Sequence, residues 1–456
     1  MRTGEALIII LNLLALISFD YGHPWPDSAA AIVSLVVCIH LVVEKSRWQM
    51  IPAYAVSGGV VALGLAGAVS SFRSNHAVEL MAAVTLLTSA LLSIVLPVFS
   101  LPRPSGRHPI GTVTRVWTRT ISPQDSSEPA RRKLTVQFWY PAQAASGRRS
   151  PYRAKRGQGL KSHLGLVRTH SFVNAPMISG VEKCAVVLFS PGWKGHLTQN
   201  SIQFEMLASH GFTVVSVEHP PAERLPADFD PSLQENLDEY PREARLRAED
   251  MSYVMDRLEE INAADPEDRF TDRFDMSQVG MFGYSFGGAV AMETCWLDER
   301  LKAGINMDGM LFGEAADAGI SKPFFFMSCD GPLPSEEELQ CGDARKRLHM
   351  QMLDLDIRRI RRSLARYGGY YLTVRGSAHS NYSDRPLYSP LKRLTDAGPV
   401  NPKTAFEIIN HYVLAFFDQY LRGNRQDCWR EDCTRHPAVD LLFHTGPPAV
   451  STPQVA

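Results

Sequence analysis

Residues 275–308 read DMSQVGMFGYSFGGAVAMETCWLDERLKAGINMD, and this stretch carries the strongest signal in the chain. An apolar run at Val279–Phe282 is typical of a buried strand, and the small residues that begin at Gly288 are typical of a tightly packed helix. Between them lies Gly283-Tyr284-Ser285-Phe286-Gly287, a G-x-S-x-G sequence in the strand–turn–helix context of a nucleophile elbow. A serine on such a sharp turn exposes its hydroxyl, and the glycines let strand and helix pack closely. The stretch therefore predicts Ser285 as a nucleophile.

Short apolar runs and amphipathic stretches alternate on both sides of this motif. They predict strands at Thr112–Thr120, Leu134–Tyr140, Cys184–Phe189, Thr213–Val217, Lys302–Met307, Pro323–Ser328 and Tyr370–Val374, and helices at Phe204–His210, Glu243–Asn262 and Thr404–Leu421. Alternating strands and helices indicate a mostly parallel sheet flanked by helices, and the elbow makes this an α/β-hydrolase fold. We expect this catalytic domain to span residues 111–423. Residues 142–158 read as a basic surface loop, and residues 424–456 as an unpatterned tail.

The first hundred residues differ from the rest because they are strongly apolar. Four apolar runs lie at Ala6–Phe19, Ala29–Val43, Ile51–Ser71 and Val78–Leu101. The last two are long enough to cross a hydrocarbon layer of ~30 Å as helices, whereas the first two are short. The runs lack the polar face that a helix of a soluble bundle shows. We therefore expect an all-α membrane module of about four transmembrane helices at residues 1–101, followed by a linker at residues 102–110.

Basic residues in the short loops predict the orientation of this module. With four crossings, Arg2, Lys45, Arg47, Arg103 and Arg107 fall on one side of the membrane. The positive-inside rule then places the large domain in the cytoplasm of a multi-pass protein of the cell membrane. The loss of one short helix would reverse that side.

A nucleophilic serine needs a base, which in this fold follows the acid along the chain. His379 lies directly after the last predicted strand, where the base belongs. His411 lies inside the last predicted helix and His349 in a charged helical stretch with no strand before it, so we predict His379 as the base.

The candidates for the acid and for one oxyanion donor lie at the ends of other predicted strands. Asp308 and Asp330 both follow predicted strands, and the fold alone leaves both open as the acid. One oxyanion donor is expected to be the backbone N–H of Phe286, at the start of the helix after the elbow. The turn Pro191-Gly192-Trp193 follows an earlier strand, so the N–H of Trp193 is the expected second donor.

Composition excludes several classes of function. A net charge of −1 over 456 residues gives no reason to expect a nucleic-acid partner. Seven cysteines are too few for a disulfide framework, and Cys428 and Cys433 are interpreted as unrelated thiols, with a bridge as the alternative. Cysteines and histidines show no metal-ligand spacing, and we expect no metal and no organic cofactor.

Several motifs in order resemble one family. LFSPGWKGH, LASHGFTVVSVEHP, VGMFGYSFGGA, INMDG and GSAHSNYSD are similar to the type II platelet-activating-factor acetylhydrolases, calcium-independent phospholipases of the α/β-hydrolase fold. The resemblance covers residues 136–422. It implies a triad of Ser285, Asp308 and His379, with Trp193 and Phe286 forming the oxyanion hole. Two features depart from the family: the Pro-Gly-Trp-Lys turn also resembles bacterial cutinase-like and dienelactone-type hydrolases, and the mammalian enzymes have no four-span module.

These observations together predict a membrane-anchored serine ester hydrolase. By the resemblance, its substrate is a short or oxidised acyl ester of a phospholipid or a similar lipid. One alternative is a carboxylesterase, lactonase or thioesterase that acts on soluble esters. Another, of a different class, is a membrane sensor whose hydrolase domain has lost activity. The sequence predicts neither the acyl length nor the headgroup, and it predicts no oligomeric state.

Overall fold

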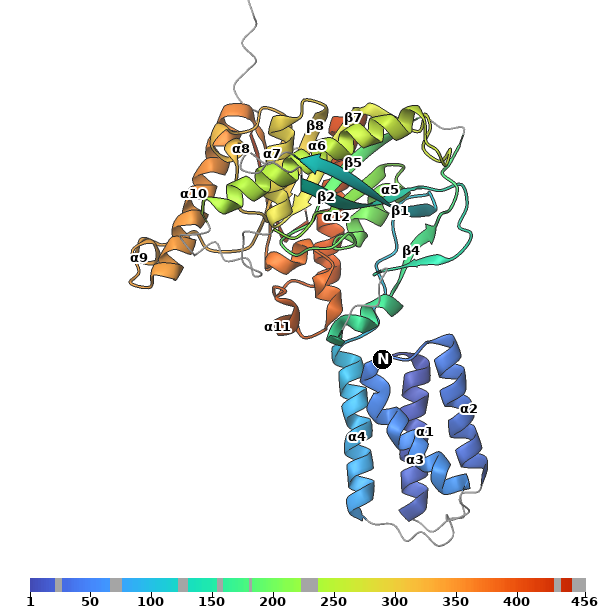
Figure 1. Ribbon diagram of the computed structural model, residues 1–456. Coiled ribbons are helices and arrows are strands. Elements are labelled where there is room, and N and C mark those ends of the chain that lie inside the picture. The colour runs from blue at the N-terminus through green and yellow to red at the C-terminus, as the bar shows by residue number, and fades with distance from the viewer. Residues whose placement is uncertain are drawn as a thin grey trace, which may run out of the picture. The chain divides into compact units, whose positions relative to one another are not determined.

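The computed structural model describes residues 1–20, 27–65, 76–121, 130–153, 159–179, 183–222, 237–429 and 436–444 (Figure 1). The chain divides into two compact units. The first comprises Met1–Leu101, Pro151–Thr169 and Pro386–Thr395, and the second comprises Pro102–Ser150, His170–Arg385 and Asp396–Ala456. This division differs from the expected boundary near residue 101, because two later stretches cluster with the N-terminal helices.

Contacts inside the first unit explain this difference. The ring of Phe99 stacks on Tyr388 with 5.7 Å between centroids and meets the edge of Tyr152 at 5.4 Å. The indole N–H of Trp48 donates to the carbonyl of Leu160 at 3.2 Å. Such long-range aromatic contacts leave no mark on the local sequence pattern from which a domain boundary is predicted.

The second unit contains a mixed sheet. Among the described residues its strands lie in the order β11 (Val439–His444), β10 (Gly369–Val374), β9 (Phe324–Cys329), β8 (Leu301–Met307), β7 (Phe274–Tyr284), β5 (Cys184–Ser190), β6 (Thr213–Glu218), β2 (Ala130–Pro141), β1 (Ile110–Ile121), β4 (Arg168–Val173) and β3 (Arg149–Pro151). The six strands from β10 to β6 are parallel, while β11, β2 and β1 pair antiparallel. Every predicted strand is present, with ends shifted by a few residues.

Helices connect these strands. They are α5 (Ser201–Ser209), α6 (Glu239–Ala263), α7 (Phe286–Leu297), α8 (Glu314–Ala318), α9 (Glu336–Leu339), α10 (Ala344–Tyr367) and α12 (Pro402–Arg422), with α11 (Lys392–Thr395) assigned to the first unit. Their ends follow ordinary capping chemistry. The Asn401 side chain accepts from the N–H of Lys403, and Pro402 occupies the first turn of α12. Gly423, with φ 73°, caps the C-terminal end of the helix.

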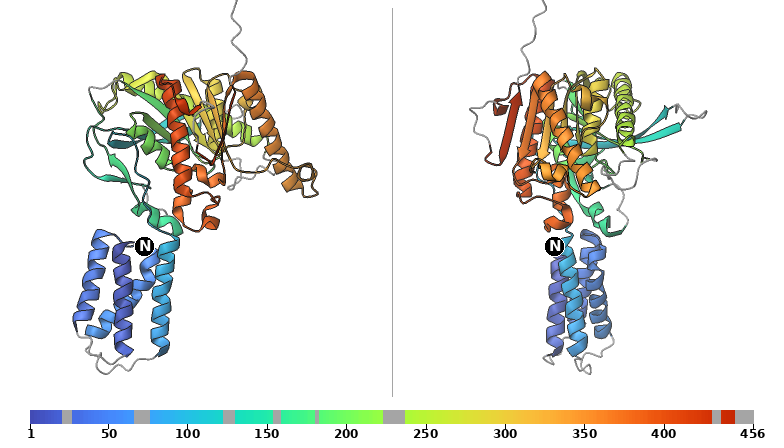
Figure 2. Two further views of the ribbon diagram at one scale, coloured as in Figure 1. Left: turned by 180° about the vertical axis from the view of Figure 1, so that it is seen from behind. Right: turned by 90° about the vertical axis from the view of Figure 1, so that its left-hand side faces the viewer.

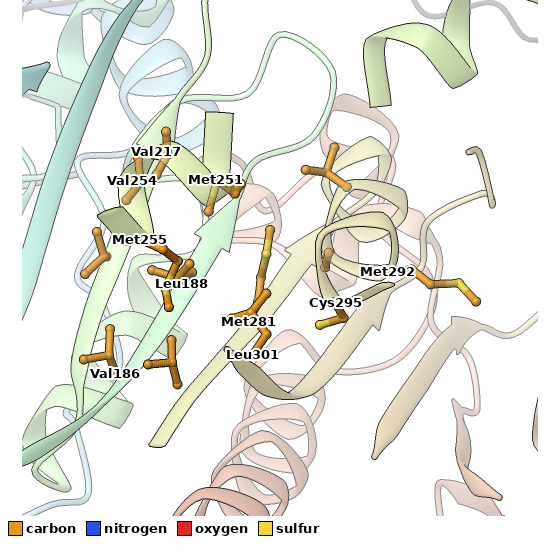
Figure 3. Packing of buried hydrophobic residues seen from close by; sticks show 14 of the residues in the cluster. Val186, Leu188, Val217, Met251, Val254, Met255, Met281, Met292, Cys295 and Leu301 are labelled. Atoms are coloured by element: carbon orange, nitrogen blue, oxygen red, sulfur yellow. The ribbon is translucent and has the colours of Figure 1, made fainter. Parts of the chain in front are cut away.

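Side chains of alternating strand residues build two cores, one on each face of the sheet. Val186 and Leu188 of β5 point to the face covered by α6 and α7, where they pack with Met251, Val254 and Met281 (Figure 3). The intervening residues of β5 point to the opposite face, which α5 and α12 cover. Figure 2 shows α12, in red, crossing that face. A parallel strand buried on both faces explains why β5 reads as a continuous apolar run.

Two segments that were expected to be irregular contain strands. Residues 424–456, expected as an unpatterned tail, contribute β11, which adds to the edge of the sheet by pairing with β10. Only Val439 and Leu441 of this short edge strand face the core, so its alternation was too brief to recognise. The basic loop at residues 142–158 contains β3, although residues 154–158 lie outside the described residues. Cys433 also lies outside them, so its relation to Cys428 stays a prediction.

Four helices form the N-terminal part of the first unit: α1 (Thr3–Asp20), α2 (Asp27–Val43), α3 (Ile51–Leu65) and α4 (His76–Val95). Within the described residues, α4 alone is long and apolar enough to cross a membrane, and the other three are shorter apolar helices. These three helices have 18, 17 and 15 residues, and at 1.5 Å per residue they span only about 23–27 Å. The end of the third apolar run, beyond residue 65, lies outside the described residues. The expectation of four transmembrane helices is therefore not confirmed.

Candidate active site

Ser285 occupies a strained turn between β7 and α7. Its backbone has φ 56° and ψ −127°, which side-chain-bearing residues rarely adopt. A Cβ atom on Gly283 would come within 1.8 Å of the Gly287 carbonyl oxygen, and one on Gly287 within 1.9 Å of the Ser190 carbonyl oxygen. Both glycines are therefore required for the turn to close, as the G-x-S-x-G sequence predicts.

His379 lies between Ser285 and Asp308. Its Nδ1 is 2.6 Å from Asp308 Oδ2, and its Nε2 is 3.0 Å from Ser285 Oγ. Since a carboxylate can only accept, Nδ1 carries the proton and donates to Asp308, which leaves Nε2 to accept from the serine hydroxyl. The ring of Tyr284 stacks on the imidazole with 4.9 Å between centroids and supports its orientation. The three side chains thus form a continuous hydrogen-bonded chain.

The turn after β8 places Asp308 for this contact. Asp308 has φ 54°, and the side chain of Asn306 closes the turn by accepting from the N–H of Gly309 at 2.7 Å and donating to its carbonyl at 3.0 Å. The other carboxylate oxygen of Asp308 accepts from the N–H of Cys329 at 2.6 Å. Burial and the neighbouring Asp308 carboxylate raise the pKa of the Cys329 thiol, so this thiol stays neutral beside the aspartate.

The other candidates occupy different places. Asp330 lies one strand later and accepts from the N–H of Gly376 at 2.8 Å, so it holds the loop that leads to His379. His411 lies in α12, next to the ring of Tyr412. His349 lies in α10 and lines a cavity in front of Ser285. Of the two carboxylates that the fold alone left open, Asp308 is the one that contacts the imidazole.

The two predicted oxyanion residues lie against the elbow. A Cβ atom on Gly192 would be 3.0 Å from Ser285 Cβ, so the turn that contains Trp193 packs directly on the serine. Phe286 is the first residue of α7, and its ring meets that of Trp193 at 5.1 Å. The Gln199 side chain accepts from the N–H of Gly192 at 3.0 Å and holds the turn. These contacts bring the two residues together, and their role as N–H donors stays a prediction.

A cavity of about 690 Å³ opens onto the serine. Helix α10 supplies one of its walls, which sequence reasoning missed. Its apolar lining residues include Met310, Phe312, Phe326, Leu353, Ile357, Ile360 and Tyr371. The exposed Arg345 and Lys346, at the start of α10, line the same cavity. The spacing of Leu353, Ile357 and Ile360 along one helical face was the sequence signal that could have found this wall.

A buried carboxyl also faces the cavity. Asp356 of α10 accepts from the N–H of Leu311 at 3.0 Å, and burial raises its pKa to about 7. Its carboxylate supports the segment after Asp308 from the α10 side.

The sheet, the elbow and the hydrogen-bonded Ser285, His379 and Asp308 have the arrangement found in serine hydrolases of the α/β-hydrolase fold. The comparisons with known proteins are more specific. The family described as "Platelet-activating factor acetylhydrolase, isoform II" matches residues 111–225 and 242–436, which is more than half of the chain. The protein therefore belongs to this family, as its motifs predicted.

Individual relatives agree with this assignment. The platelet-activating factor acetylhydrolase of Cavia porcellus is 27% identical over 296 residues, which cover 58% of this chain and 64% of that protein. A probable 1-alkyl-2-acetylglycerophosphocholine esterase of Arthroderma benhamiae is 24% identical over 278 residues, covering 56% of this chain and 66% of that protein. The chain thus spans just under two thirds of the length of these relatives. A ferulic acid esterase from Streptomyces cinnamoneus superposes with a TM-score of 0.58 at 26% identity, covering 76% of this chain and all of that one.

Proposed function

We propose that this protein is a serine ester hydrolase. The observation that carries the proposal is the hydrogen-bonded chain from Asp308 through His379 to Ser285. In the first step His379 accepts the proton of the serine hydroxyl while Ser285 Oγ attacks the ester carbonyl carbon. Asp308 stabilises the imidazolium, which then gives its proton to the leaving alcohol as the acyl–oxygen bond breaks. Water, activated by the same imidazole, releases the acyl group as a carboxylic acid.

In this reaction a negative charge develops on the carbonyl oxygen. The backbone N–H groups of Trp193 and Phe286 are the proposed donors that stabilise it. The contact of Gly192 with Ser285 supports this placement, since it brings the turn within reach of the attacked carbon.

The cavity supports a lipid ester as the substrate. Its apolar side chains fit an acyl or alkyl chain, and Arg345 and Lys346 supply positive charge for an anionic group such as the phosphate of a phospholipid. Together with the family assignment, this favours a short or oxidised acyl ester of a phospholipid or a similar lipid.

The first unit supports attachment to a membrane, because its polarity is the reverse of a soluble bundle. Arg47 and Glu5 form a buried ion pair with 2.6 Å between Nη2 and Oε2, and Asn12 donates to Ser57 at 2.8 Å inside the bundle. Large apolar side chains face outward on α1, α2 and α4, with Leu87 67% exposed. Other members of this exposed set are Leu7, Ile10, Leu14, Leu35, Ile39, Leu80 and Leu91. Polar groups inside and apolar ones outside suit a lipid surrounding. We propose a multi-pass protein of the cell membrane with a cytoplasmic catalytic domain.

A fluorophosphonate probe and a substrate series test the function. The wild-type protein should be labelled covalently, and Ser285→Ala should abolish the label and reduce ester turnover by about 10⁴-fold or more. Ser277→Ala is a matched control, since Ser277 is an exposed serine of the same strand. A Ser285→Ala protein that still takes the label would contradict the proposal, and an unlabelled wild type would favour the inactive membrane sensor.

Substrate choice is measured with p-nitrophenyl esters of graded chain length beside an sn-2-acetyl phospholipid. We expect the phospholipid to give the highest kcat/KM. A clear preference for soluble aryl esters would favour the carboxylesterase alternative, with which the esterase-like structural neighbour agrees in fold.

A further inference from the structure

Helix α6 lies on the same face of the sheet as α7, the helix that follows the elbow (Figure 1). One of its residues, Arg247, is almost fully buried, with 5% exposure. The guanidinium lies 5.0 Å from the ring centroid of Trp193 and 5.0 Å from that of Phe286. Its Nε donates to the Glu243 carboxylate at 2.6 Å, which compensates the buried charge. A planar cation against two aromatic rings attracts both and fixes their separation.

These two rings belong to the two proposed oxyanion residues, which come from different elements. Trp193 lies in the turn after β5, and Phe286 begins α7. Their N–H groups must converge on one oxygen atom, so the distance between the two backbones decides how well the oxyanion is held. Arg247 contacts both rings at once. Tyr240 of the same helix also packs against both, with centroids 5.7 Å from Trp193 and 6.2 Å from Phe286, but Arg247 alone of these two brings a positive charge to the rings.

A second contact ties the start of the same turn to α6. Ser190 ends β5 directly before Pro191-Gly192-Trp193 and is fully buried. Its Oγ lies 3.1 Å from Nε2 of His219, and Nδ1 of His219 lies 3.1 Å from Oδ2 of Asp250 on α6. The hydrogen-bonded series Ser190–His219–Asp250 has the residue types of a catalytic triad. Because Ser190 has no exposed surface, however, it cannot meet a substrate.

The charged groups around Asp250 and His219 determine which atoms donate and which accept in this hydrogen-bonded series. Asp250 also accepts from Arg119 at 2.9 Å and from Arg132 at 2.7 Å. Burial alone would raise the pKa of the Asp250 carboxyl, but hydrogen bonds from His219 and Arg132 hold it well below its usual range. Burial lowers the pKa of His219 to about 4, so the ring is neutral at neutral pH. The neutral ring donates from Nδ1 to the carboxylate and accepts at Nε2 from the Ser190 hydroxyl.

We propose that Arg247 and His219 are positioning residues for the oxyanion hole. Arg247 holds Trp193 against Phe286, and His219 holds the end of β5 against α6. Neither side chain touches the reacting atoms; both act by fixing the two N–H donors. The inference rests on the proposed function, because it presupposes that an oxyanion forms at this place.

The experiment compares steady-state kinetics with the affinity of a boronic acid inhibitor, whose tetrahedral adduct with serine places an oxygen in the oxyanion hole. The variants are Arg247→Met, Arg247→Lys, the double variant Glu243→Gln/Arg247→Met, and His219→Asn, which keeps a donor toward Asp250 and loses the contact with Ser190. Arg115→Met is the matched control. Arg115 also stacks on a ring, that of Phe270 at 5.1 Å, and pairs with the buried Asp265 at 2.8 Å.

We expect Arg247→Met and His219→Asn to lower kcat about 10- to 100-fold with KM changed less than about twofold. Inhibitor affinity should fall by the same factor as kcat/KM, and Arg247→Lys should recover part of both. Arg247→Met leaves the buried Glu243 carboxylate without its partner, and the double variant removes that carboxylate. If the double variant regains the wild-type Tm but not the wild-type kcat, the loss of kcat comes from lost positioning and not from lost folding. Arg115→Met should leave kcat and inhibitor affinity unchanged.

Two results would overturn the inference: variants with wild-type kcat and inhibitor affinity, and a wild-type protein that takes no label. In the first case the folded variants lose only Tm, and Arg247 and His219 are structural. Fluorophosphonate labelling of the wild type distinguishes this outcome from a failure of the function itself. A labelled wild type with unaffected variants overturns this inference alone, whereas an unlabelled wild type overturns both.

Discussion

Asp308 and Asp330 end adjacent parallel strands, yet their carboxylates hold different partners. Asp308 accepts from the imidazole of His379, and Asp330 accepts from the N–H of Gly376 in the loop before it. Replacing the acid of a triad by its amide leaves the wrong imidazole tautomer. We therefore expect Asp308→Asn to reduce kcat by about 10⁴-fold, as measured in an esterase assay with a p-nitrophenyl ester.

Asp330→Asn serves as the comparison for this residue. Because Asp330 supports only the loop, its amide should cost about tenfold or less in kcat, with a small decrease in Tm. Thermal melting of both variants checks that each is folded. A well-folded but inactive Asp330→Asn beside an active Asp308→Asn would place the acid one strand later.

At the scale of the element, α10 carries a testable assignment of substrate chemistry. Its N-terminal residues Arg345 and Lys346 are exposed to the cavity, whereas its middle presents apolar side chains. Asp343 caps the helix by accepting from both of their N–H groups, which fixes where the two basic side chains begin. Lys346 lies 3.5 Å from the Glu338 carboxylate. A substrate phosphate would compete with this carboxylate for the Lys346 ammonium group.

We expect Arg345→Gln and Lys346→Gln each to raise KM for a phosphate-bearing ester by about fivefold, equivalent to about 1 kcal/mol. KM for an uncharged ester with the same acyl group should not change. Arg361→Gln, on the same helix but outside the cavity lining, is the control for a general effect of charge. Equal changes for both esters, or none for either, would remove α10 from phosphate recognition.

At the scale of the whole molecule, the proposed membrane attachment predicts a topology that depends on how many of the N-terminal helices cross a bilayer. Helix α4 is long enough on its own, and the shorter helices need help from their flanks or a thinner bilayer. If all four cross, the loop bias of Arg2, Lys45, Arg47, Arg103 and Arg107 places the linker in the cytoplasm. A green fluorescent protein fused after Pro104 should then be fluorescent, and alkaline phosphatase at the same place inactive.

Reporters fused in the other predicted loops check the same topology independently. A reporter after Ser46 should behave like the one after Pro104, and a reporter after Arg73 should give the opposite result. Active phosphatase after Pro104 would mean an odd number of crossings, with α1 as the first helix to remove from the count.

Local patterns in the sequence were enough to predict the α/β-hydrolase fold and to propose Ser285 and His379 as site residues. The elbow around Ser285 is recognisable because its strand, its glycines and its helix are consecutive in the chain. His379 follows a short apolar strand directly, so its place in a loop at the end of the sheet could be inferred without a structure. The family could be inferred too, since its motifs occur in a fixed order.

Contacts between distant segments could not be inferred in this way. The choice of Asp308 over Asp330 depends on which carboxylate a loop about 50 to 70 residues away approaches, and the fold alone left both open until the family resemblance favoured one. The contacts of Arg247 with Trp193 and Phe286, and the place of β11 at the sheet edge, depend likewise on long-range packing. The periodicity of apolar residues indicates which face of a helix or strand is buried, but it does not indicate which other element packs against that face.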